Sequence, residues 1–111
     1  MTDPQGARDR RAVERFPVNS DTACDFLSPV LEDFGPVRIK NISNDGIGLV
    51  VSRKLEAGLL LSVNLVNRSR SFTKTMLVRV VHVTPQPGGT FLIGGTFKTP
   101  LTYEELTAMV M

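Results

Sequence analysis

Short apolar runs separated by turn-forming residues are the feature that most constrains the fold of this chain. Apolar and polar residues alternate in Val37-Arg38-Ile39-Lys40 and again along residues 59–66, a period of two that is typical of strands with one buried face. Further strand-length runs lie at residues 47–51, 76–83 and 90–97. We expect Gly94-Gly95 to break the last of these runs, because glycine weakens a strand interior.

Turn signals stand between these runs and predict how they connect. They are Asn44-Asp45-Gly46, Glu56-Ala57-Gly58, Asn67-Arg68-Ser69 and Pro85-Gln86-Pro87-Gly88-Gly89. Asp-Gly and Gly-Gly pairs supply the positive φ angles that tight hairpins require. Several short strands at this spacing predict a mainly all-β domain, a closed or nearly closed antiparallel barrel. Closure also removes the exposed strand edges that promote aggregation.

The two ends of the chain differ from the strand-rich middle. Residues 1–10 have no apolar periodicity and contain Asp3-Pro4, which predicts a flexible arm before a single domain at 11–111. At the other end, Thr102 is expected to cap a short helix at about 101–110, with Glu105 as its reciprocal partner. An apolar stripe on that helix is expected to pack on a barrel mouth; its members are Leu106, Met109 and Val110.

Composition excludes several classes of protein. The chain has 111 residues, of which 41% are hydrophobic, so it can build one small core. A single cysteine and a single histidine rule out an internal disulfide and make a metal centre of soft ligands very improbable, so no metal or other cofactor is expected. No apolar run approaches the ~20 residues of a membrane span, and the start lacks a secretory signal. A cytoplasmic protein is therefore expected.

No pattern in the sequence predicts catalysis. Paired carboxylates, a nucleophile elbow and a phosphate-binding P-loop are all missing, so we do not expect an enzyme. We interpret His82, between Val81 and Val83, as a structural or face-exposed histidine, since no cysteine or acidic partner lies at a spacing typical of a catalytic site. Cys24 is interpreted as a small strand residue rather than a reactive thiol.

Charge is distributed unevenly along the chain. The formal net charge is only +2, but residues 16–37 carry four acids and no base, and residues 53–79 carry six bases against Glu56 alone. The near-neutral total therefore conceals separate positive and negative faces.

Two polar motifs stand out against this background. Arg11 and Arg15 are spaced as RxxxR, with Arg10 just upstream, and a guanidinium can grip phosphate, pair with a guanine edge or stack on a purine. Taken alone, such a cluster is more often a solvated basic arm. The second motif, Asn41-Ile42-Ser43-Asn44-Asp45-Gly46, places short hydrogen-bonding groups at a predicted turn, which alone is ordinary turn chemistry.

The order and spacing of the two motifs resemble the PilZ domain family. The family pattern is RxxxR, then [D/N]xSxxG, a β-barrel, and a late strand that contains Gly-x-x-Phe. Here the matching segments are Arg11–Arg15, Asn41–Gly46 and Ile93-Gly94-Gly95-Thr96-Phe97. The resemblance covers residues 8–110 and implies a small six-stranded antiparallel β-barrel of PilZ type, with a flexible N-terminal arm and a short C-terminal helix.

The resemblance also implies a ligand, cyclic di-GMP, a bacterial second messenger with two guanines and two bridging phosphates. By position, Arg11 and Arg15 match the family's arginines, and Asn41 and Ser43 match the polar pair that meets a guanine from the barrel surface. Two further matches are Gly46, the turn glycine, and Arg10, at a position that influences whether one ligand or an intercalated pair binds. Asp45 departs from the pattern, because a carboxylate near a phosphate weakens binding unless it points away.

We therefore expect a stand-alone cyclic di-GMP sensor that signals to a separate effector protein. The arm through about Arg15 is expected to be mobile until it folds over the ligand, which is an order–disorder switch. One alternative is a degenerate PilZ-like barrel that binds only a protein partner. The other is a barrel that binds single-stranded nucleic acid, which the basic segment at 53–79 favours but the shortage of aromatic side chains opposes.

Overall fold

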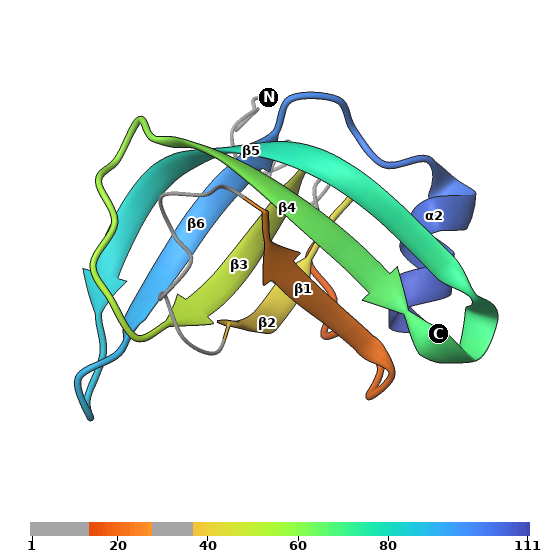
Figure 1. Cartoon of the computed structure of the whole chain (residues 1–111), viewed down its shortest axis with the longest axis horizontal. Coiled ribbons are helices and arrows are strands. Elements are labelled where there is room, and N and C mark those ends of the chain that lie inside the picture. The colour runs from red at the N-terminus through yellow and green to blue at the C-terminus, as the bar shows by residue number, and fades with distance from the viewer. Residues whose placement is uncertain (1–13, 28–36) are drawn as a thin grey trace, which may run out of the picture.

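A computed structural model describes residues 14–27 and 37–111. These residues form a six-stranded antiparallel, nearly closed β-barrel with one helix at the C-terminus (Figure 1). The strands are β1 (Thr22–Phe26), β2 (Val37–Ile42), β3 (Gly46–Val51), β4 (Leu60–Asn67), β5 (Phe72–Pro85) and β6 (Phe91–Phe97). A short 3-10 helix, η2 (Arg68–Arg70), joins β4 to β5, and α2 spans Tyr103–Val110. No helix within the described ranges is long and apolar enough to cross a membrane.

The strands follow the order β1-β4-β5-β6-β3-β2, and every neighbouring pair is antiparallel. The long strand β5 curves across the barrel and pairs with β4 along one half and with β6 along the other (Figure 1). The two end strands, β1 and β2, approach each other and bring the sheet close to closure. The predicted barrel is confirmed.

Alternation along each strand sends one set of side chains into the barrel. In β3, Ile47, Leu49 and Val51 are at most 1% exposed, and the intervening positions face outward. β4 alternates in the same way, with Leu61, Val63 and Leu65 in the core. Because the side-chain period is two, this core fixes which residues appear on the outer face, where the candidate site lies.

The structure corrects two expectations about glycine. Gly94-Gly95 does not break the last strand, since β6 runs unbroken from Phe91 to Phe97. The irregularity lies instead in β5, whose register to β6 shifts between Val80 and His82. The predicted positive φ is found at Gly58, Gly88 and Gly89 but not at Gly46, which must be needed for another reason.

The C-terminal helix begins as predicted. Thr102 Oγ1 accepts from the Glu105 backbone N–H, and Glu105 Oε1 accepts from the Thr102 N–H, which completes a capping box. Met109 is fully buried in the core, and Leu106 and Val110 pack against it. The apolar stripe therefore packs on the barrel, as expected.

The free energy of unfolding should decrease at acid pH because the Glu105 carboxylate becomes protonated. A hydrogen bond from Lys74 Nζ to Oε2 at 2.6 Å, together with the Thr102 N–H, lowers the pKa of this carboxyl below its usual value. A lowered pKa in the folded state stabilises the protein above the unfolded pKa, and this stabilisation is lost as pH falls through the folded value.

We expect Glu105→Gln to lower the free energy of unfolding at pH 7 by about 0.5–1 kcal/mol, because the pair is partly solvated. The difference from the wild type should shrink as the pH falls through the lowered pKa of Glu105, because the carboxyl then becomes protonated. Urea unfolding at a series of pH values from 7 downward measures this effect. A difference that stays constant over the whole acid range would contradict a stabilising role of the Glu105 charge.

Cys24 should be unreactive in the folded protein. Its side chain lies in β1 and is 3% exposed. Burial, with a smaller contribution from the adjacent Asp25 carboxylate, raises the pKa of the thiol to about 12. Since the thiolate is the nucleophile, we expect alkylation by iodoacetamide at pH 8 to be about a thousandfold slower than for an unfolded chain. Mass spectrometry of native and guanidinium-unfolded samples measures both rates, and equal rates would refute the buried placement.

Candidate functional site

The chain that precedes β1 is attached to β2 through Phe16. Phe16 and Ile42 form an antiparallel bridge, with both N–H···O bonds at 2.8 Å. This bridge brings the exposed Arg15 beside Asn41, and Arg15 Nη1 donates to Asn41 Oδ1 at 3.0 Å. The bond places Arg15 against the outer face of the barrel, next to the second motif.

Gly46 allows the Arg15 guanidinium to lie close to the barrel because glycine has no side chain. A methyl group at this position would lie 2.8 Å from the Gly95 carbonyl oxygen and 3.1 Å from Arg15 Nη2. Both distances are shorter than ordinary contacts, so any side chain would displace either the neighbouring strand or the guanidinium. Gly46 is thus required for close packing rather than for a left-handed backbone.

Ser43 and Asp45 hold the turn between β2 and β3. The Ser43 N–H donates to the Gly46 carbonyl at 2.9 Å, and Ser43 Oγ donates to Asp45 Oδ1 at 3.1 Å. Ser43 is fully buried, so its hydroxyl lies inside the turn rather than on the barrel surface. For Ser43 to donate to a ligand, its hydroxyl would have to give up the bond to Asp45 and become accessible.

The turn is also fastened to the end of β6. The Asp45 carbonyl accepts from the Phe97 N–H at 2.9 Å, and the Asn44 carbonyl accepts from the Leu101 N–H at 2.6 Å. These backbone bonds hold the turn that connects Asn41 to Gly46 against the chain at and just beyond the end of β6.

A row of register partners crosses the outer face beside Arg15. Asn41 on β2 stands opposite Gly48 on β3, Gly48 opposite Gly94 on β6, and Gly94 opposite His82 on β5. A methyl group at Gly48 would lie 2.7 Å from Asn41 Oδ1, and one at Gly94 would overlap the His82 imidazole. The Asn41 amide therefore lies over Gly48 and the His82 ring over Gly94, at the two ends of this row.

The predicted site residues are only partly brought together. Arg15, Asn41 and Gly46 converge, and Ser43 is adjacent but buried. Arg10 and Arg11 lie outside the described residues, as does the predicted arm at 1–10. His82 is exposed, in agreement with its interpretation as a structural or face-exposed histidine, and its pairing opposite Gly94 has no signal in the sequence.

The chemistry of this surface is dominated by hydrogen-bond donors. The Arg15 guanidinium has five N–H donors, and the bond to Asn41 uses one of them. With Asn41 Oδ1 accepting from Arg15, the other group of that amide is the Nδ2 donor. Exposed Arg38 and Lys40 add positive charge on β2, and Asp45 is held by Ser43. Such a surface suits a ligand that carries phosphate and other acceptor atoms.

A comparison with protein-family models matches residues 9–110 to the PilZ domain. Comparisons with curated proteins and with solved structures give no match. The family match spans nearly the whole chain, from the RxxxR segment to the end of α2. Together with the six-stranded barrel, it shows that the chain belongs to the PilZ domain family.

Proposed function

We propose that this protein is a sensor of cyclic di-GMP that acts on a separate effector protein. PilZ domains generally bind this nucleotide and are typically binding domains without catalytic activity. The observation that carries the proposal to this chain is the bond from Arg15 to Asn41 above Gly46. It joins the two family motifs, which lie 26 residues apart, at one point of the outer face.

The chemistry of the ligand fits these groups. Cyclic di-GMP has two negatively charged phosphodiesters and two guanines whose O6 and N7 atoms accept hydrogen bonds. A guanidinium can donate two parallel bonds to a phosphate or to that guanine edge. In the proposed complex, Arg15 donates to the ligand while Asn41 orients it. Arg11, one motif spacing earlier in the chain, supplies the second guanidinium, and Arg10 contributes to ligand stoichiometry.

Asp45 is compatible with an anionic ligand in this arrangement. Its Oδ1 accepts from Ser43 Oγ, so the carboxylate is engaged within the turn. Because of this contact, the presence of Asp45 is a weaker argument that the chain is a degenerate barrel that does not bind the nucleotide. Ligand binding would add a nucleotide and the Arg11 segment to the outer face, and the effector would recognise that composite surface.

Isothermal titration calorimetry of the purified chain with cyclic di-GMP tests the proposal. We expect saturable binding with a micromolar or lower Kd and no binding of GTP at the same concentrations. The fitted stoichiometry separates one bound ligand from an intercalated pair. Absence of saturable heat at cyclic di-GMP concentrations far above micromolar would reject the sensor and leave the partner-binding barrel.

A further inference from the structure

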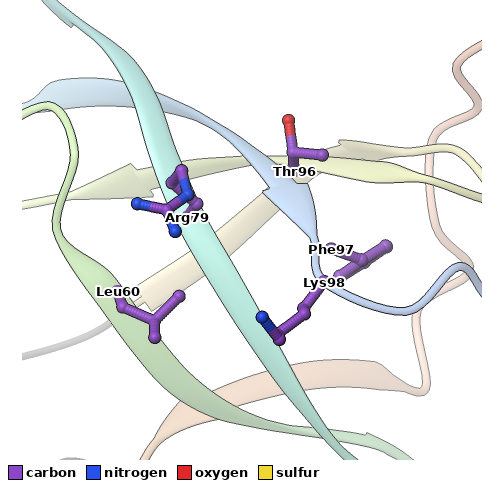
Figure 2. A pocket seen from close by; sticks show the side chains of 5 residues that line it. All are labelled: Leu60, Arg79, Thr96, Phe97 and Lys98. Atoms are coloured by element: carbon purple, nitrogen blue, oxygen red, sulfur yellow. The ribbon is translucent and has the colours of Figure 1, made fainter.

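A pocket of about 210 Å³ lies on the outer face beyond the candidate site, between β4, β5 and the end of β6 (Figure 2). Its lining includes two cationic side chains, Arg79 and Lys98, together with the Thr96 hydroxyl and the Leu60 side chain. All four of these side chains are exposed or nearly so. A hollow with two cations and a hydroxyl is a place for an anion.

The pocket and the candidate site share one row of the sheet. Gly46 on β3 stands opposite Thr96 on β6, Thr96 opposite Arg79 on β5, and Arg79 opposite Leu60 on β4. Their inward-facing neighbours, such as Ile47 and Val78, are buried, so this row lies on the outer face. Gly46 and Arg79 are two strand spacings apart, about 10 Å.

No bulky side chain of that row lies between Arg15, which is above Gly46, and Arg79. Gly46 has no side chain, and Arg15 lies directly over it. Thr96, the residue between Gly46 and Arg79, is small and offers a hydroxyl. A ligand bound at Arg15 can therefore extend over Thr96 toward Arg79 without displacing the barrel.

The two cations in the pocket are not neutralised by acids in the described part of the chain. Within that part, the ion pair is formed by Lys74 and Glu105, at the other end of the long strand β5. Arg79 Nη1 donates a long hydrogen bond of 3.4 Å to the Gly58 carbonyl, a neutral group, so no described acid compensates its charge. Two cations without an acidic partner among the described residues favour an anionic group at this concave site.

From these observations we propose that Arg79, Thr96 and Lys98 form an anion subsite that binds a phosphate of the cyclic dinucleotide held at Arg15. This inference rests on the proposed function and deepens it, because it extends the ligand surface from β2 and β3 across to β5. Thr96 and the two cations then donate to the phosphate oxygens, and Leu60 borders the ligand with apolar surface.

The test is a calorimetric titration of cyclic di-GMP into the wild type and the double variant Arg79→Gln/Lys98→Gln. The matched control is Arg68→Gln/Arg70→Gln, which removes the same charge from exposed side chains of η2 at the far end of β4. We expect the pocket variant to lose about tenfold to a hundredfold in affinity and the control less than about twofold. The affinity of the pocket variant should also depend less on salt.

The outcomes of this test distinguish failure of the anion subsite from failure of the proposed function. Equal affinity in the wild type and the pocket variant, with binding lost in Arg15→Ala, would overturn the subsite and keep the sensor. Equal losses in the pocket and η2 variants would also overturn it, because the effect would then be one of net charge. Lack of binding by the wild type would reject both. Thermal unfolding of each variant confirms that affinity is compared between folded proteins.

Discussion

Replacement of Arg15 by alanine is expected to lower the affinity for cyclic di-GMP by about a hundredfold. The guanidinium supplies charge-assisted hydrogen bonds to the ligand, each worth about 1.5–3 kcal/mol. Because the Arg15 side chain is exposed and, among the described residues, hydrogen-bonds only to the Asn41 side chain, its removal should leave the barrel folded. Calorimetric titration of the variant measures the loss, and an unchanged melting temperature shows that folding is intact.

Two further variants test whether the loss of affinity is specific to the Arg15 guanidinium. Arg15→Lys keeps the charge but not the planar fork, so we expect it to recover less than half of the lost binding free energy. Arg70→Ala removes an exposed arginine from η2 and should bind like the wild type. Full affinity in Arg15→Ala would contradict the role given to this residue, even if the protein binds the nucleotide.

Replacement of Asn67 by alanine is expected to lower the free energy of unfolding by about 3–4 kcal/mol. Asn67 is fully buried at the end of β4, and the two N–H donors of its Nδ2 are shared among three acceptors at 2.9–3.0 Å: Asn19 Oδ1, Thr22 Oγ1 and the Ala108 carbonyl. Its Oδ1 accepts from Ser69 Oγ and the Arg70 N–H. The variant removes the donor that joins the segment before β1, β1 itself and the end of α2, and it takes away the acceptor of the Arg70 N–H in η2.

Asn64→Ala is the matched control for this change. Asn64 lies on the same strand, but its buried Oδ1 has no hydrogen-bond partner among the residues that the structure describes. Removing it relieves an unsatisfied group, so we expect a loss below about 1 kcal/mol. Urea unfolding of both variants measures the two free energies. Similar losses in both would show that the Asn67 bonds do not hold the ends of the barrel together.

The barrel was predictable because its core follows simple alternation. In β4 every second residue from Leu61 to Leu65 is buried, and this pattern is visible in the sequence. The start of β5 was missed: Phe72–Thr75 is rich in polar residues, and its pairing with β4 fixes it as strand. β1 was not delimited either, since Thr22–Phe26 carries no clear alternation and is held by β4.

The site was predictable in its motifs but not in its geometry. The spacing of Arg15, Asn41 and Gly46 indicates a family pattern, yet only the Phe16–Ile42 bridge explains why the first two meet. Ser43 is buried in the turn and bonded to Asp45, and neither feature has a signature in the sequence. The row from Gly46 to Arg79 joins three strands whose pairing is set by the closure of the barrel.

The most direct test of nucleotide binding at this surface is a two-dimensional ¹H–¹⁵N NMR titration of the labelled protein with cyclic di-GMP. We predict saturable shifts of the Arg15 and Asn41 side-chain N–H groups and of the Gly46 and Gly48 backbone amides. Amides of η2, at the far end of β4, should not move. Saturable shifts confined to residues away from β2 and β3, or a spectrum unchanged at millimolar ligand, would contradict the account.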